Sequence, residues 1–287
     1  GCTAQLNVDV SEPFKRAGDP AFTTSNHYDF QVSCNGGSDG WIKVEIVGGD
    51  YGPNTYQIIW ETGDITDSLY GLRADTFQLM IVDSINCTYP WAYILREPDS
   101  IVSFTYLLSD TNGYHISCYG NEDAYIKVNA VGGVHDYSYK WFVNDTLVPS
   151  LNKDSIFNLK AANYYVIVTD KNNCIATDTL IINQPDSLYF ILNTATDTCN
   201  LNKGFAELEP YGGVVGYKYF WSTGDLLSYI DTLSDGRYEV MLQDANLCEV
   251  SKSFDIANLP SPIAYFTVNP SYKKLEEQLK NPFVFID

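Results

Sequence analysis

The sequence predicts an all-β protein made of tandem immunoglobulin-like β-sandwich repeats. Most of its 287 residues fall into short runs of Val, Ile, Tyr, Phe and Thr, separated by Gly, Asn and Asp, which is typical of strands and turns. One pattern of about 80 residues occurs three times, as in proteins built from repeated domains. Because each copy holds roughly seven short strands with turn signals between them, it indicates a sandwich.

Two cysteines and a Gly-Gly pair align the three copies. FQVSCNGGSDGWIKVEIVGG (30–49) matches YHISCYGNEDAYIKVNAVGG (114–133), and DTCNLNKGFAELEPYGG (197–213) is a weaker copy, one residue shorter after its Cys. A Tyr-x-x-x-Trp strand follows each, at 56–60, 137–141 and 217–221. Each copy then closes with a hairpin in which an Asp precedes a second Cys by four residues, at 71–87, 158–174 and 232–248.

A strand and a Pro-marked joint (REPDS, NQPDS, NLPSP) end each copy. We therefore place repeat 1 at 30–98, repeat 2 at 99–186 and repeat 3 at 187–260. Residues 1–13 have the form of the last strand of a preceding repeat, with a cysteine, Cys2, whose partner would lie upstream. Residues 14–29 are expected to be a linker or lead-in, and residues 261–287 the start of a different, incomplete β module.

Each strand pattern assigns its residues to one face of the sandwich. Alternation along 41–47 and 125–131 predicts one buried face and leaves Lys43 and Lys127 outside. The Gly-Gly pairs, including Gly48-Gly49, mark tight turns that need positive φ. The tryptophans of the recurring strand are expected at the core centre, and the tyrosines are expected in core packing or cross-strand pairs rather than sugar binding: Trp60, Trp141, Trp221, Tyr56, Tyr137 and Tyr217.

Composition and missing motifs narrow the function. The net charge of −19 argues against nucleic acid and anionic membranes as partners, because both attract basic surfaces. No apolar run approaches the length of a transmembrane helix. No P-loop, HExxH or G-x-S-x-G motif occurs. We therefore predict a non-enzymatic protein with no catalytic residue and no required cofactor.

Three recurring motifs resemble the SprB-type repeats of large cell-surface proteins in gliding Bacteroidetes. They are Ser-Cys-x-Gly-x-x-Asp-(Gly/Ala) at 33–40 and 117–124, Val-Gly-Gly before Tyr-x-x-x-Trp, and Val-x-Asp-x-x-x-Cys at the close. The resemblance covers about 30–260. Repeat 3 departs from it with CNLNKG after its first Cys, and repeat 2 carries an extended loop, VNDTLVPSLNK. The tail from Pro262 resembles the start of a PKD-like module that precedes the sorting domain of type IX secretion substrates.

The resemblance implies a secreted adhesin or stalk segment of the gliding-motility type, on the extracellular face of the outer membrane. Its implied partners are the type IX secretion and gliding machinery, and surface polysaccharide is a further candidate. Two alternatives stay open. One is a carbohydrate-binding accessory region of a secreted glycosidase, and the other is a calcium-dependent adhesion module.

The six repeat cysteines are expected to form one disulfide in each repeat, since disulfides persist in secreted proteins. A bond of this span stabilises a domain by about 4 kcal/mol in the chain-entropy model. No C-x₂-C pair suggests a metal site, and His27, His115 and His135 do not recur with the cysteines as a thiol nucleophile would need. The expected pairs are Cys34–Cys87, Cys118–Cys174 and Cys199–Cys248.

Acidic residues beside the cysteines allow two interpretations. The Asp before each second Cys fits an Asx turn, in which its carboxylate accepts backbone N–H groups, and the alternative is a calcium ligand assisted by a nearby Asn. We favour the turn for Asp83, Asp170 and Asp244, near Asn86, Asn172 and Asn246. We likewise favour solvated turn acids over a metal site for Asp39, Glu122 and Asp123.

A second recurring tripeptide, Asp-(Ser/Thr)-(Ile/Leu), resembles the O-glycosylation motif of exported Bacteroidetes proteins. The alternative is that the repeats simply copy turn-rich tripeptides. The candidate glycosylated hydroxyls are Ser68, Ser84, Ser100, Thr146, Ser155, Thr179, Ser187 and Thr232.

Overall fold

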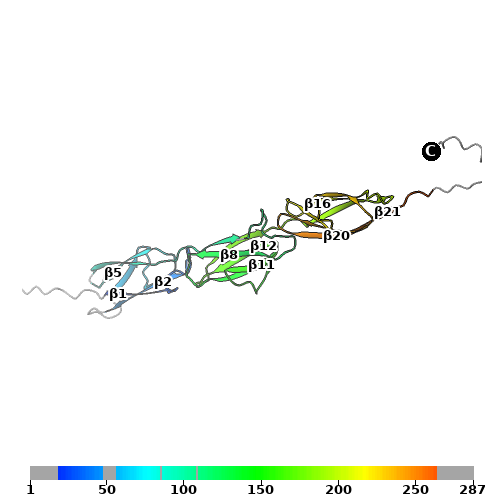
Figure 1. Cartoon of the computed structure of the whole chain (residues 1–287). Coiled ribbons are helices and arrows are strands. Elements are labelled where there is room, and N and C mark those ends of the chain that lie inside the picture. The colour runs from blue at the N-terminus through cyan, green and yellow to red at the C-terminus, as the bar shows by residue number, and fades with distance from the viewer. Residues whose placement is uncertain (1–18, 48–55, 85, 108, 264–287) are drawn as a thin grey trace, which may run out of the picture. The chain divides into compact units, whose positions relative to one another are not determined.

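The computed structural model describes residues 19–47, 56–84, 86–107 and 109–263, which form strands, turns and connecting segments (Figure 1). The all-β prediction is confirmed. Across these ranges no helix is long and apolar enough to cross a membrane. The chain divides into two compact units, 1–185 with repeats 1 and 2, and 186–287 with repeat 3. Cys2, Gly48-Gly49 and the tail from 264 lie outside the described residues.

Repeat 1 is a sandwich of two antiparallel three-stranded sheets. One sheet has the order β1-β2-β4 and the other β3-β5-β6. Strand β1 pairs along its whole length with β2, so the sandwich begins within the segment expected to be a lead-in. The strands are β1 (Asp19–Thr24), β2 (Gly40–Val47), β3 (Tyr56–Trp60), β4 (Ser68–Leu72), β5 (Thr76–Asp83) and β6 (Thr88–Ile94).

Repeat 2 has the same two sheets with one added strand. Its sheets have the orders β11-β8-β7 and β10-β9-β12-β13. The added strand β10 comes from the extended loop, which folds back on β9 through Asn144 and Asp145, both at positive φ, as tight hairpin turns require. The strands are β7 (Val102–Leu107), β8 (Ala124–Val131), β9 (Ser138–Val143), β10 (Thr146–Leu147), β11 (Ser155–Leu159), β12 (Ala162–Thr169) and β13 (Ile175–Ile182).

Repeat 3 repeats this plan with the sheets β14-β16-β18 and β17-β19-β20. A short parallel pair, β15 with β21, joins the segment before its first cysteine to the end of the repeat. The strands are β14 (Tyr189–Ala195), β15 (Asp197–Thr198), β16 (Gly204–Tyr211), β17 (Lys218–Trp221), β18 (Tyr229–Leu233), β19 (Gly236–Gln243), β20 (Glu249–Ile256) and β21 (Asn258–Leu259).

Each repeat has its own core between its two sheets, with the recurring tryptophan at the centre, as predicted. Trp60, Trp141 and Trp221 are 2%, 0% and 5% exposed. Each indole N–H donates to a backbone carbonyl across the core, at 2.8–2.9 Å, so burial leaves no unpaired donor. The predicted alternation also holds in β2 and β8, where every second residue is buried at the start of the strand.

In each sandwich, two short strands follow one another in the same direction and together span its length once, which we count as one pass of the chain. In repeat 1, β3 and β4 have five residues each, whereas β2 and β5 have eight. Strand β3 starts opposite the end of β5, at Asp83, and β4 ends opposite the start of β2, at Gly40. The chain therefore crosses the sandwich three times between the start of β2 and the end of β5.

Candidate functional site

The disulfide connectivity differs from the prediction, and it defines the candidate site. Cys34 of repeat 1 bonds Cys174 of repeat 2, with their Cα atoms 5.6 Å apart and 140 positions apart in sequence. Cys118 and Cys248 are also disulfide-bonded, whereas Cys87 and Cys199 are free thiols. The expected pairs Cys34–Cys87, Cys118–Cys174 and Cys199–Cys248 are therefore wrong, and so is the rule of one disulfide within each repeat.

Three passes along the sandwich separate the two cysteines of a repeat. Val32, two residues before Cys34, donates its N–H to the carbonyl of Arg96, two residues after the end of β6. Cys87 directly precedes β6 at its other end. Strand β6 has seven residues, about 23 Å at roughly 3.3 Å per residue. A disulfide requires Cα atoms within about 7 Å, so Cys34 cannot reach Cys87.

The segment around Cys34, residues 27–39, is the cysteine loop of repeat 1. Hydrogen bonds from the backbone N–H groups of Gln31 and Val32 to the carbonyl of Arg96 hold this loop against the end of the repeat. The carboxylate of Glu97 adds a second anchor by accepting the backbone N–H of Gly36 at 2.8 Å. These hydrogen bonds within repeat 1 hold the loop in place independently of its contacts with repeat 2.

The segment 170–174 is the cysteine turn of repeat 2, and Asp170 organises it. One carboxylate oxygen accepts the backbone N–H groups of Asn172 and Cys174 at 2.9 and 2.8 Å. The other accepts the N–H of Val134 at 2.8 Å. Asp170 is only 4% exposed, and backbone donors pair with both of its oxygens. The Asx-turn interpretation is confirmed.

The same turn recurs in the other repeats. Asp244, fully buried, accepts from Asn246, Cys248 and Val214 at 2.8–2.9 Å. Asp83 accepts from Cys87 at 2.8 Å. Across the described residues, no group of three His, Cys, Asp or Glu side chains is arranged to hold a metal ion.

The Gly-Gly pair of repeat 2 brings the cysteine turn against the linker from repeat 1. Both glycines have positive φ, and Gly133 donates its N–H to the carbonyl of Asp99 in that linker. A Cβ on Gly132 would lie 2.1 Å from the Ser100 carbonyl oxygen, and one on Gly133 would lie 2.5 Å from the Asp170 carboxylate. Only glycine fits at either position.

We expect Gly133→Ala to destabilise repeat 2 well beyond the ordinary cost of a positive φ. Gly120→Ala is the matched control, because Gly120 also has positive φ but a Cβ there would meet no atom within 4 Å. The control should cost about 1–2 kcal/mol, and Gly133→Ala should cost clearly more, because it displaces a buried carboxylate. Hydrogen exchange of repeat 2 amides measures the difference; equal losses in the two variants would contradict the proposed close contact.

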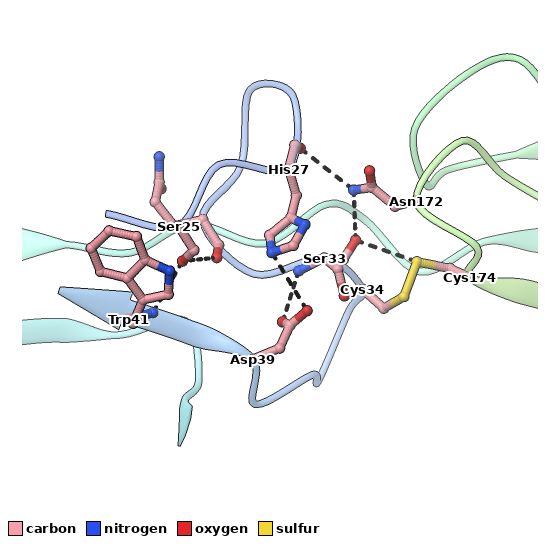
Figure 2. Close-up of polar contacts among 9 residues, drawn as sticks. Ser25, His27, Ser33, Cys34, Asp39, Trp41, Asn172 and Cys174 are labelled. Atoms are coloured by element: carbon pink, nitrogen blue, oxygen red, sulfur yellow. Dashed lines mark hydrogen bonds and ion pairs between the residues drawn. A yellow bond between two sulfur atoms is a disulfide. The ribbon is translucent and has the colours of Figure 1, made fainter. Parts of the chain in front are cut away.

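Repeat 1 and repeat 2 also meet through polar contacts around the bond, forming a joint that the sequence did not reveal (Figure 2). The side-chain amide of Asn172 donates to the carbonyls of Ser33 at 2.8 Å and His27 at 3.5 Å. The Lys171 ammonium lies 4.3 Å from the ring centre of Tyr28, a cation–π contact. We call the cysteine loop of repeat 1, the cysteine turn of repeat 2 and the linker between them the covalent joint.

The acidic residues of the cysteine loops shape those loops. Asp39 accepts the backbone N–H of Ser33 at 3.0 Å and lies 3.5 Å from His27 (Figure 2). Partial burial opposes ionisation of Asp39, but the hydrogen bonds from Ser33 and the nearby His27 outweigh it and lower the pKa. Asp123 accepts from Ser117 in the same way. Glu122 instead forms an ion pair with Lys160 at 2.9 Å.

Repeat 3 lacks this loop acid and uses a different one. Asp197 takes the position of the buried residues Val32 and Ile116 and is itself fully buried. Its carboxylate accepts the N–H of Lys203 at 2.9 Å, which closes the loop that is one residue shorter. The missing residue after Cys199 was the signal for this change.

The candidate glycosylation hydroxyls all lie at or near the surface. Two are half-buried, at the first residues of β4 and β11, and the rest are exposed. Ser68 and Ser155 are the half-buried pair; Ser84, Ser100, Thr146, Thr179, Ser187 and Thr232 are the exposed ones.

Comparison with known families identifies the repeat. The model of the SprB repeat family matches residues 31–64 and 116–146, which include the first cysteine and the Gly-Gly pair of repeats 1 and 2. The chain contains SprB repeats. The matched segments leave out repeat 3, whose altered loop was the predicted departure from the family pattern. No curated protein matches the chain.

Among solved structures, three multi-domain proteins align with the chain at low similarity. The N-terminal eight Ig domains of Down syndrome cell adhesion molecule align at 9% identity and a TM-score of 0.38, over 85% of this chain and 35% of that one. This chain thus spans about a third of that protein's length. Dpr2 Ig1-Ig2 in complex with DIP-Theta Ig1-Ig3 aligns at 10% identity, TM-score 0.30, over 79% and 95%. Protocadherin gamma B2 domains 3–6 align at 9% identity, TM-score 0.32, over 83% and 74%.

Proposed function

We propose that this chain is a non-enzymatic, load-bearing segment of a cell-surface adhesin or stalk. The covalent joint carries the proposal, because the Cys34–Cys174 bond closes a loop that includes most of repeats 1 and 2. Tension applied on either side of this pair passes through the disulfide. Strands β2 to β12, which lie between the two cysteines, are therefore shielded from being pulled apart, whereas β1 and β13 lie outside the closed loop.

The SprB repeats support the location and the partners. A secreted protein on the extracellular face of the outer membrane keeps its disulfides, as the joint requires. The type IX secretion and gliding machinery would export and move it, and surface polysaccharide is the contact we propose for the adhesive function. Glycans on the exposed hydroxyls would increase hydration of a surface whose charge is already −19.

Surface labelling of living cells tests this function. A fluorescent antibody raised against residues 19–263 should label intact, unpermeabilised cells of the source organism. Labelled spots that travel along the cell would support a driven gliding adhesin, whereas static spots would support a passive stalk and contradict the gliding assignment. Labelling that appears only after permeabilisation would overturn the surface location. Antibody preabsorbed with the purified chain is the control.

A further inference from the structure

The covalent joint has two different halves, and every repeat carries both. The cysteine loop lies at one end of a repeat and the cysteine turn at the other. In the joint, the loop of repeat 1 bonds the turn of the repeat that follows it. Two halves outside this joint carry free thiols, the turn of repeat 1 and the loop of repeat 3.

These two thiols belong to Cys87 and Cys199. They are the free thiols among the described residues, whereas the other four repeat cysteines are disulfide-bonded. The Cys34–Cys174 joint, in which a cysteine loop bonds a cysteine turn, therefore predicts what each free thiol should bind.

Cys87 lies in a turn that already has the conformation of the bonded one. Asp83 accepts the Cys87 N–H at 2.8 Å and donates its own N–H to the Cys87 carbonyl at 3.1 Å. Asp170 makes the same two contacts with Cys174, at 2.8 and 2.9 Å. The residue before each cysteine has positive φ, 63° at Asn86 and 67° before Cys174. The two turns differ in burial, because Cys174 is only 8% exposed, whereas Cys87 lies exposed at the surface.

Cys199 lies in a loop held at the other end of its repeat. Its N–H donates to the carbonyl of Leu259 at 2.8 Å, and Asn200 donates to the side chain of Asn258 at 3.2 Å. The Cys34 loop is held to the end of repeat 1 in the equivalent place, through Arg96. Both cysteines are half-buried, so the loop of repeat 3 presents its thiol as the loop of repeat 1 presents its sulfur.

We propose that Cys87 and Cys199 are open ends of a covalent ladder of SprB repeats. Cys87 forms a disulfide with the cysteine loop of another repeat, and Cys199 with the cysteine turn of another repeat. Two thiols release two protons and two electrons to a disulfide oxidant, the new S–S bond forms, and the oxidant is reduced to two thiols. The inference extends the proposed stalk function, by stating how repeats join beyond these three.

A second copy of the chain supplies both complementary ends for the test. The 287-residue chain with Cys2→Ser is incubated in oxidised and reduced glutathione, then separated on non-reducing gels. We expect dimers and longer species, with a Cys87–Cys199 peptide found by mass spectrometry beside the internal Cys34–Cys174 peptide. Cys87→Ser and Cys199→Ser should each remain monomeric alone. An equal mixture of the two variants should stop at the dimer.

Two results would overturn the proposal. One is that each single variant crosslinks to itself as strongly as the mixture does, which would make the pairing non-specific. The other is that both thiols only become capped with glutathione and no linked peptide forms. The crosslinking test is made on purified protein, so its outcome is independent of the surface-labelling test. A protein that labels on the cell surface can still fail to crosslink, and a chain that crosslinks can still prove not to lie on the surface.

Discussion

Removing the Cys34–Cys174 bond should add about 470 Å to the length of the chain under tension. The bond closes a loop of 140 positions, and an extended chain spans roughly 3.4 Å per residue. With the bond intact, unfolding between the two cysteines releases no length. With Cys34→Ser and Cys174→Ser together, the two sandwiches can unravel in full. Single-molecule stretching, with handles at Gly1 and the exposed Ser187, measures the increment directly.

A thiol that takes no part in the bond supplies the control. Cys87→Ser should leave the length unchanged, since Cys87 is free. Added reductant should reproduce the effect of the double variant, because Cys34 and Cys174 both line an open cavity of about 270 Å³ through which a small thiol can approach. If the oxidised protein extends as far as the double variant, the disulfide does not carry the load and the proposed function loses its main support. The closed loop itself is worth about 5 kcal/mol in the chain-entropy model.

Asp170→Ala should destabilise repeat 2 by about 3–5 kcal/mol and loosen the covalent joint. The substitution removes three hydrogen bonds to a buried carboxylate, each worth about 1.5–3 kcal/mol when the acceptor is charged, though losses at one site do not add in full. It also leaves three backbone N–H groups without their partner. Hydrogen exchange of the Asn172, Cys174 and Val134 amides locates the loss.

Two further variants make the Asp170 prediction specific. Asp136→Asn removes the charge of an exposed carboxylate that pairs only with Lys171 at 3.3 Å among the described contacts, keeps a residue type that tolerates the positive φ at this position, and should change stability by about 0.5 kcal/mol or less. Asp244→Ala should produce the same loss as Asp170→Ala, but in repeat 3. Unchanged exchange at the three amides in Asp170→Ala would show that the turn holds its shape without the carboxylate.

Local features of the repeat were predictable because they depend on neighbours in sequence. Alternating apolar residues predicted the strands, and the recurring tryptophan predicted the centre of each core. The role of the Asp in the cysteine turn could also be predicted, since an Asx turn involves backbone donors two and four residues away. Its third contact, to Val134, was not, because that donor belongs to a different turn, 36 positions earlier.

The pairing of the cysteines in the covalent joint could not be predicted from the strand patterns. Whether the two cysteines of a repeat lie together depends on how many times the chain crosses the sandwich between them. Four strands separate Cys34 from Cys87, and four full passes would return the chain to its starting end. Because β3 and β4 share a single pass, the chain makes three and finishes at the opposite end.

The repeat, the sandwich, the buried tryptophans and the shape of the cysteine turn could therefore be predicted from the amino-acid pattern alone. Which cysteines meet depended on the three-dimensional fold. Cys34 lies closer in sequence to Cys87 than to Cys174, yet a strand of about 23 Å keeps Cys34 and Cys87 apart. The linker between the repeats brings the Cα atoms of Cys34 and Cys174 to 5.6 Å from each other. The length and direction of the strands, rather than the cysteine motif, therefore determine that the disulfide joins two repeats and does not lie within one.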